Sequence, residues 1–380
     1  MPSFDYDLVI AGASFAGAAC ALAAARAGLR VLVLERKTDP GDKLHTTGIL
    51  VREAIEQTWL GQAPADCVHR VEQVKLYSPR LRSLNLSAPG YYFHTTDTPR
   101  LMRWLAAELV RHRVELRLGQ AFVGAVPRHG GWHVTGVGHT RYLVGADGAQ
   151  SRVAQCAGLG RVHSFLYGVE YEFPGLALPE PDALHCFITR RFAPGYIGWF
   201  AQNPTGVQAG LALRYRPRRG RAPDLDGLLA HVRERAGLPQ LAQPAATRAG
   251  LIPCGGPVLP LARDGVILTG DAAGIVSPLT AGGIHYAFAH GEAVGDAVAA
   301  HLLRGGPAPE AVASAGAPRF RAKRALRWMF ERFQCDWPFD LMLYSPPLRW
   351  AAEQIYFHQR GAQSAQSAQS APPARAAASA

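Results

Sequence analysis

Cysteine is scarce in this sequence, and it never occurs in an arrangement that binds a metal or builds a disulfide framework. The six cysteines among 380 residues are scattered, with no Cys-x-x-Cys pair and no Cys/His cluster at zinc-finger spacing. This scatter excludes a disulfide-stapled scaffold and predicts that no metal is bound. It also fits a reducing compartment, so we predict a cytoplasmic protein.

Signatures of nucleic-acid binding are missing as well. The chain is basic, with 40 Lys and Arg against 29 Asp and Glu and a net charge of +11. No helix-turn-helix, zinc-finger or RNA-recognition motif accompanies these charges, so we predict no nucleic-acid partner. The positive balance favours smaller anionic partners, such as nucleotides or lipid headgroups.

A signal peptide and a membrane-spanning helix are not expected either. Residues 8–25 carry no charge, but Asp5 and Asp7 precede them where a signal peptide would be basic. Gly12 and Gly17 interrupt the same stretch. A buried strand, a tight turn and a helix explain this pattern better than a membrane span does.

Hydrophobic periodicity predicts an α/β chain that opens on a βαβ unit. Strands are predicted at Tyr6–Ala11 and Leu29–Glu35, with a helix at about Phe15–Ala27 between them. Short alternating runs between about 160 and 250 predict an antiparallel sheet, interrupted by a helix near Leu225–Arg235. This inserted region is predicted to bind the substrate.

The first nucleotide motif is Gly12-Ala13-Ser14-Phe15-Ala16-Gly17, between the first strand and the first helix. Gly12 allows a tight turn, and Gly17 lets the helix pack closely on the strand. Ser14 replaces the usual middle glycine, and its small hydroxyl side chain can donate to a phosphate. Alone, this imperfect motif also fits a tight turn without a ligand.

Glu35, at the end of the second strand, strengthens the nucleotide interpretation. A carboxylate about twenty residues past the glycines is placed to accept hydrogen bonds from ribose hydroxyls. It disfavours a 2′-phosphate and therefore favours FAD or NAD over NADP. Arg36 beside it is a further candidate contact, although a solvated surface charge explains it equally well.

Two further motifs each follow a predicted strand and make the pattern specific. They are Gly145-Ala146-Asp147-Gly148-Ala149-Gln150-Ser151-Arg152 and Gly270-Asp271-Ala272-Ala273-Gly274, the second continuing through Pro278 to Gly283. Together with the glycine turn and Glu35, they resemble the glutathione-reductase-type flavoproteins of the hydroxylase superfamily, and most closely the geranylgeranyl reductase family. The similarity covers most of residues 5–305.

This resemblance implies FAD as the cofactor and assigns individual contacts. It implies that Asp271 hydrogen-bonds the ribityl chain, that Pro278 lies beside the isoalloxazine, that Arg100 reaches the cofactor, and that the backbone of Val123 touches adenine. A surface capping charge is the alternative for Arg100. The predicted cofactor residues are Gly12, Ser14, Gly17, Glu35, Arg36, Arg100, Val123, Asp147, Gly270, Asp271, Pro278, Gly282 and Gly283.

The predicted fold class is therefore α/β, a Rossmann-type FAD-binding domain with an inserted α+β substrate domain and C-terminal helices. Two aromatic and basic helices are expected between residue 306 and about Gln359. The predicted divisions are 1–65, 95–160 and 250–305 for FAD binding, 66–94 and 161–249 for the substrate, 306–360 for the C-terminal helices, and a disordered tail at 361–380.

An aromatic run at residues 193–200 resembles the strand that lines the isoprenoid pocket of geranylgeranyl reductases, although its spacing differs. Tyr196, Trp199 and Phe200 are the candidate substrate residues, and packing in a sheet core is the alternative. Successive side chains of a strand point to opposite faces, so Trp199 and Phe200 cannot both face one cavity unless a bulge intervenes. Trp199 is the preferred candidate.

The loop from Asp42 to Gly48 carries the candidate catalytic residue. Geranylgeranyl reductases generally have a cysteine here close to the flavin, and this chain has Thr46 instead. His45 beside it is a candidate proton donor, with a solvated loop histidine as the alternative.

The preferred function is reduction of a carbon–carbon double bond in a hydrophobic, isoprenoid or lipid-like substrate. A flavin-dependent monooxygenase or dehydrogenase of a small hydrophobic molecule is the alternative, and a flavin-binding protein without turnover is a third. NAD(P)H is a candidate electron donor. Aromatic and basic residues at 324–360 also suit peripheral contact with the inner face of a membrane, although a helical cap on the substrate domain explains them as well.

Overall fold

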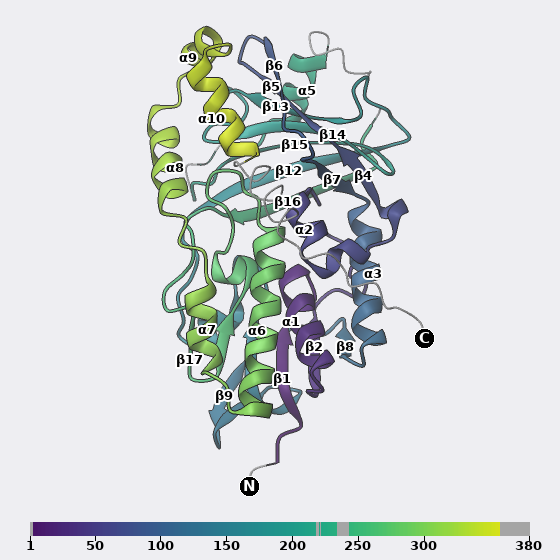
Figure 1. The fold of residues 1–380 in the computed structure, drawn as a ribbon, viewed down its shortest axis with the longest axis vertical. Helices are drawn as coiled ribbons and strands as arrows, with labels where there is room; N and C mark the ends of the chain where they lie inside the picture. The colour runs from purple at the N-terminus through teal and green to yellow at the C-terminus, as the bar shows by residue number, and fades with distance from the viewer. Residues whose placement is uncertain (1–2, 218–219, 221, 234–242, 358–380) are drawn as a thin grey trace, which may run out of the picture.

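Two large sheets, set one above the other along the long axis, organise the chain (Figure 1). The structure is a computed structural model that describes residues 3–217, 220, 222–233 and 243–357, without the side chains of Phe333 and Met342. The predicted disordered tail at 361–380 lies outside the described residues. The α/β fold class predicted from the sequence is confirmed.

The first sheet contains the predicted βαβ unit. Its strands follow the order β17-β18-β11-β1-β2-β8, and β9 and β10 extend it from β11. β1 pairs in parallel with β2 on one side and with β11 on the other, while β18 continues the parallel set from β11. The strands are β1 (Tyr6–Ala11), β2 (Val31–Glu35), β8 (Glu115–Leu118), β9 (Ala125–Arg128), β10 (Gly131–Val134), β11 (Gly138–Gly145), β17 (Ala262–Arg263) and β18 (Val266–Leu268).

This strand order brings the three sequence motifs together. They follow β1, β11 and β18, three neighbouring parallel strands whose carboxyl ends lie at one edge of the sheet. In open parallel sheets, ligands bind at this edge, where the chain connections diverge. The fold therefore places residues more than 250 positions apart in the sequence, such as Gly12 and Asp271, at one site.

Helices α1 (Phe15–Arg26) and α6 (Ile284–Arg304) run side by side against this sheet (Figure 1). Glycines allow their close contact. A Cβ added at Gly291 would lie 2.2 Å from the carbonyl oxygen of Ala16, and one added at Gly295 would lie 2.3 Å from that of Cys20. Small residues on α6 thus let it pack closely on α1.

The second sheet has the order β16-β12-β15-β14-β13-β5-β6. Its neighbouring strands are antiparallel except for the parallel pair of β13 and β5. The strands are β5 (Gln73–Tyr77), β6 (Ser83–Ser87), β12 (Phe165–Pro174), β13 (Ala183–Ile188), β14 (Ile197–Asn203), β15 (Gly206–Arg214) and β16 (Ala246–Pro253). A small sheet of β3 (Leu50–Val51), β7 (Phe93–Thr96) and β4 (Val68–Val71) lies beside it.

The C-terminal region contains more helices than the two that the sequence predicted. Within the described residues it forms α7 (Pro309–Gly316), α8 (Arg321–Phe333), α9 (Asp336–Met342) and α10 (Pro346–Tyr356). Pro346 and Pro347 start α10, because proline is tolerated only in the first turn of a helix. The remaining helices are α2 (Arg52–Glu56), α3 (Thr98–Arg111), α4 (Arg152–Cys156) and α5 (Leu225–Arg233), with short 3₁₀ turns at Trp59–Gln62, Ala65–Cys67 and Gly270–Ala273.

Two sequence expectations differ from the structure in detail. The apolar residues of Ala121–Val126 predict a strand over that range, but β9 begins only at Ala125, and residues 119–124 form an irregular segment. β16 belongs to the second sheet and runs to Pro253, past the predicted boundary at 249. The division into FAD-binding and substrate-binding domains stays a proposal. No helix of the described chain is long and apolar enough to cross a membrane.

Candidate functional site

A cavity of about 690 Å³ connects the carboxyl edge of the first sheet with one face of the second. Residues of all three sequence motifs line it, and so do residues of β12, β14 and β16 and of the C-terminal helices. The nucleotide motifs and the aromatic strand therefore share one continuous space.

Three predicted glycines are required by the shape of this site. Gly12 has φ +102°, and an added Cβ would lie 2.3 Å from the carbonyl oxygen of Ala146 in the second motif. A Cβ at Gly17 would lie 1.9 Å from the carbonyl oxygen of Gly12, and one at Gly270 would lie 2.7 Å from Cβ of Ala16. Any other residue would push apart the turns that form the site.

Ser14 occupies the position where the usual motif has its second glycine. Its backbone is extended, with φ −79° and ψ −172°, a conformation open to every residue. Its side chain is exposed at the start of α1, in the lining of the cavity. The structure therefore accommodates serine here without strain.

Two helices direct their N-termini at the cavity. α1 begins after Ser14 and α6 after Gly283, and within the described chain neither helix has a side-chain cap hydrogen bond or an acidic residue in its first turn. The amide groups of a first helical turn have no partner inside the helix, and they attract anions together with the helix dipole. Both helix ends are therefore suited to the negative groups of a nucleotide cofactor.

The three predicted acidic residues line the cavity but differ in their partners. Glu35 accepts hydrogen bonds from the amides of Ala13 and Lys37, each at 3.0 Å. Asp147 accepts from the Ser151 hydroxyl and the Arg152 amide, each at 2.6 Å, and so caps α4.

Asp271 is the exception among these carboxylates. The described residues supply no hydrogen-bond donor to its side chain, and burial raises its pKa to about 6. A half-buried carboxylate without a protein donor costs free energy unless a ligand supplies one. Asp271 is therefore suited to accept a hydrogen bond from a hydroxyl or amide group of a ligand.

The aromatic strand divides its side chains between two faces of the second sheet. Trp199 lines the cavity, and its indole Nε1 donates to Oε2 of Glu170 at 3.0 Å. Tyr196, just before β14, also lines the cavity and donates its hydroxyl to the carbonyl of Thr280. Phe200 is fully buried on the opposite face, against Phe187. The prediction that Phe200 lines the substrate cavity is wrong, because the strand alternates without a bulge.

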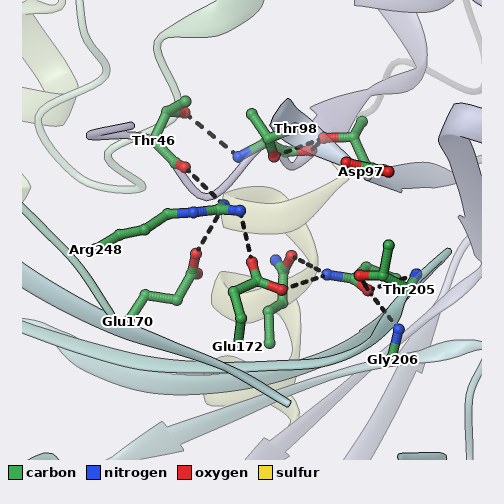
Figure 2. A network of polar contacts seen from close by, with 12 residues as sticks. Thr46, Asp97, Thr98, Glu170, Glu172, Thr205, Gly206 and Arg248 are labelled. Carbon is green, nitrogen blue, oxygen red and sulfur yellow. Dashed lines mark hydrogen bonds and ion pairs between the residues drawn. The ribbon is translucent and has the colours of Figure 1, made fainter. Parts of the chain in front are cut away.

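A buried ionic cluster next to Trp199 was not predicted from the sequence. Figure 2 shows Arg248 of β16 between Glu170 and Glu172 of β12, close to the loop at Thr46. Arg248 Nη1 lies 3.4 Å from Glu170 and Nη2 lies 2.9 Å from Glu172, and Nη1 also donates to the carbonyl of Thr46 at 3.4 Å. Burial raises the pKa of Glu170 to about 8 and also raises that of Glu172. The signal in the sequence was two carboxylates, two positions apart, in an otherwise apolar strand.

His45 links the same loop to the second sheet. Its Nδ1 donates to the carbonyl of Ala249 at 2.7 Å, so its Nε2 accepts from Arg36 at 3.3 Å. His45 and Arg36 both line the cavity. The catalytic role of His45 stays a prediction, but both of its ring nitrogens already have protein partners.

The comparisons with known proteins agree with this geometry. Residues 5–326 match the family described as FAD binding domain. The chain belongs to this family of FAD-binding proteins. It is 30% identical over 336 residues to Digeranylgeranylglycerophospholipid reductase 2 of Methanothermobacter thermautotrophicus, covering 85% of this chain and 83% of the relative.

Two solved structures show the same fold. A geranylgeranyl bacteriochlorophyll reductase-like protein of Thermoplasma acidophilum superposes with a TM-score of 0.79 at 16% identity, covering 95% of this chain and 98% of that one. A probable FAD-dependent monooxygenase of Pseudomonas aeruginosa has a TM-score of 0.64 at 18% identity, covering 91% and 98%. The predicted resemblance to geranylgeranyl reductases and to FAD-dependent oxidoreductases is confirmed at the level of the family, whereas the wider glutathione-reductase label is loose.

The residues of this chain fit FAD as its cofactor. Gly12 and Gly17 let the turn after β1 pack tightly against the second motif and the first turn of α1, and the amides of α1 face the cavity beside this turn. Asp271 offers an acceptor that lacks a donor in the described chain. A flavin dinucleotide has a diphosphate for the helix terminus and polyol hydroxyls for the carboxylate.

Four predicted cofactor residues lie outside the cavity lining of the described chain. One is Gly17, which packs against the carbonyl of Gly12. Arg100 is exposed, and its guanidinium pairs with Asp66 at 2.6 Å. Val123 is 57% exposed, because β9 starts later than expected. Pro278 is buried. Phe122, next to Val123, and Leu279, next to Pro278, line the cavity instead, and cofactor contacts from the four predicted residues themselves stay predictions.

Proposed function

We propose that this chain reduces a carbon–carbon double bond of a hydrophobic, isoprenoid- or lipid-like substrate, with FAD bound at the carboxyl edge of the first sheet. The observation that carries the proposal is the continuity of the FAD site with a cavity walled by Tyr196, Trp199 and apolar residues of α8 to α10. The reductase relative, matched over most of its length, supports the same chemistry.

In this proposal the chain binds and orients the cofactor with the residues predicted from the sequence. The N-terminus of α1 holds the diphosphate, Glu35 accepts from the adenosine ribose, Asp271 accepts from the ribityl chain, and the N-terminus of α6 faces the flavin ring. Bound FAD supplies the two-electron chemistry. The apolar walls orient the substrate and exclude water.

Replacement of Asp271 by alanine is expected to weaken FAD binding about tenfold or more, because a hydrogen bond to a charged acceptor contributes about 1.5 to 3 kcal/mol. The affinity should also fall as the pH drops through about 6, since protonation removes the acceptor that FAD favours. Fluorescence titration of apoprotein with FAD at pH 5 and 7.5 measures both effects. Asp271→Asn, which does not titrate, should abolish the pH dependence. An unchanged affinity in Asp271→Ala would place FAD elsewhere.

An anaerobic assay separates the candidate reactions. Protein reduced with dithionite is mixed with a geranylgeranyl-bearing lipid, and the return of oxidised-flavin absorbance is followed together with the mass of the lipid. A reductase reoxidises and adds two hydrogens to the lipid without oxygen. A monooxygenase modifies the lipid only when oxygen is admitted. A non-catalytic flavin protein leaves the lipid unchanged with or without oxygen. NADH and NADPH, the proposed donors, are tested by their ability to replace dithionite.

We also propose that α8 to α10 contact a membrane surface, through which a lipid-like substrate would enter. Their outward side exposes Trp328, Trp337, Leu341 and Trp350 beside exposed arginines such as Arg349. Their other side lines the cavity through Phe330, Phe339 and Leu348. Aromatic rings with basic neighbours are typical of the interface between headgroups and acyl chains.

The protein is expected to co-sediment with phosphatidylglycerol vesicles at low salt and to dissociate as salt rises, because charge attracts it and the exposed rings anchor it. Trp337→Ala combined with Leu341→Ala should lower the bound fraction several-fold. The matched control is Val110→Ala with Val126→Ala, two exposed apolar residues of α3 and β9. Equal binding by both double variants, or no binding by the unmodified protein, would contradict the contact.

A further inference from the structure

We propose that Glu170 is the acid of this cavity and delivers the proton that completes reduction of the substrate double bond. This inference rests on the proposed function and assigns to a residue of this chain a step that the family resemblance leaves open. It follows from where the carboxyl lies, which groups face it, and which other acids of the cavity are already engaged.

Glu170 lies in the middle of the second sheet and reaches the cavity beside the aromatic wall. Its strand is paired on both sides, with Gly210 of β15 and Arg248 of β16 directly opposite, so its backbone position is well defined. Its side chain is only 4% exposed and lines the cavity. Oε2 accepts from Trp199 at 3.0 Å, which fixes the carboxyl against the ring predicted to contact the substrate.

The charges around Glu170 favour its protonated form. Arg248 is the cation that faces it, but Arg248 lies closer to Glu172, at 2.9 Å, than to Glu170, at 3.4 Å. One guanidinium therefore neutralises Glu172, and a second carboxylate would leave excess negative charge in a dry site. Burial and Glu172 raise the pKa of Glu170 to about 8 against the opposing effects of Arg248 and Trp199.

Other acidic groups of the cavity are less suited to donate. The Tyr196 hydroxyl is engaged with the carbonyl of Thr280, and burial raises its pKa. The Nδ1 of His45 donates to the carbonyl of Ala249, and its Nε2 accepts from Arg36. The pKa of Asp271 is near 6, so it is ionised at neutral pH. Glu170 combines a proton at neutral pH with a place in the substrate wall.

The proton step balances with the chemistry of the cofactor. Reduction breaks the π bond and forms two C–H bonds, one of them with a hydride that reduced FAD, when bound, would supply. The second carbon takes the proton from the Glu170 carboxyl as its O–H bond breaks. The resulting carboxylate is stabilised by Arg248 and the Trp199 N–H. A proton from solvent restores the acid between turnovers.

Glu170→Gln tests this step, because glutamine keeps the shape and can still accept from Trp199 but carries no acidic proton. Anaerobic reduction of a geranylgeranyl-bearing lipid should slow by about a hundredfold to ten-thousandfold, the usual contribution of a positioned acid. FAD content should stay unchanged. Glu108→Gln is the matched control, because Glu108 is equally buried but lies in α3, paired with Arg111 and away from the cavity. This control should keep its rate.

A second measurement does not depend on turnover. Infrared spectroscopy of the oxidised protein should show a protonated carboxyl band that disappears as the pH rises through about 8 and is missing in Glu170→Gln. The free energy of unfolding should fall between pH 5 and 8 in the unmodified protein. A carboxyl whose pKa is raised in the folded state stabilises the fold while protonated and loses that contribution as it ionises. Glu170→Gln should flatten this slope.

Glu172→Gln provides a directional test. Without the Glu172 charge, Arg248 interacts with Glu170 as its one carboxylate partner in the cluster. The pKa of Glu170 should therefore fall, and the basic limb of the pH–rate profile should shift to lower pH. A purely structural cluster would not move that limb.

The outcomes separate the two proposals. If the unmodified protein cannot reduce the lipid, the proposed function and the proton step are both overturned. If it can, and Glu170→Gln reduces the lipid at a comparable rate or the carboxyl band is missing in the unmodified protein, the function stands and the role of Glu170 is overturned.

Discussion

Replacement of Gly12 by valine is expected to abolish FAD binding. The backbone of Gly12 has φ +102°, which a β-branched residue adopts only with strain, and the added Cβ would overlap the Ala146 carbonyl at 2.3 Å. The contact between the first and second motifs would open, and the amides of α1 would turn away from the cavity. We expect the affinity to fall at least about hundredfold, or about 2.8 kcal/mol. The ratio of flavin to protein absorbance in purified, folded protein measures it.

Ser14→Gly is the matched control for this variant. It restores the usual glycine at a position whose backbone is already relaxed, so FAD content should stay as it is. Circular dichroism shows whether Gly12→Val is still folded. A folded Gly12→Val protein that retains stoichiometric FAD would mean that the glycine turn does not approach the cofactor.

Truncation of Trp199 to alanine is expected to cause a loss of substrate turnover of at least about tenfold in a stable, yellow protein. The indole packs over Gly210, where an added Cβ would lie 2.4 Å from the ring, and its open side lines the cavity. Removing it widens a space that already exists, so the cost in stability should be below the about 3 to 5 kcal/mol typical of a large buried aromatic residue. Turnover per folded molecule and the thermal midpoint are measured together.

Phe200→Ala gives the opposite pattern and serves as the control on the adjacent residue. Phe200 is fully buried on the other face of β14, so its truncation should cost the full core penalty while turnover per folded molecule stays constant. Trp199→Phe separates the ring from its hydrogen bond to Glu170. A large loss of stability in Trp199→Ala with unchanged turnover would assign Trp199 to the core.

Several predictions from the sequence hold because they depend on local patterns. β1, α1 and β2 lie close to the predicted ranges, since their apolar runs and the glycine turn specify a buried βαβ unit over 30 residues. Successive side chains of β14 likewise point to opposite faces of the sheet, so Trp199 lines the cavity and Phe200 does not. Other expectations depended on contacts that the local pattern does not encode. The Arg100 guanidinium pairs with Asp66, and its contact with the cofactor stays a prediction. The strand expected from Ala121 begins only at Ala125, four residues later.

By itself the sequence determined the main features of the predicted cofactor site, because each is encoded within a short segment. These features are the glycine turn at Gly12, the carboxylate of Glu35 at the end of β2 and the uncapped N-terminus of α1. Only the tertiary structure decided the chemistry of the cavity beside it. Arg248 donates to Glu170, which lies 78 positions away in the sequence, and to the carbonyl of Thr46, which lies 202 positions away. The proton on Glu170 depends on how deeply these partners bury it and on which carboxylate takes the single guanidinium, and both depend on distances that exist only in the folded chain.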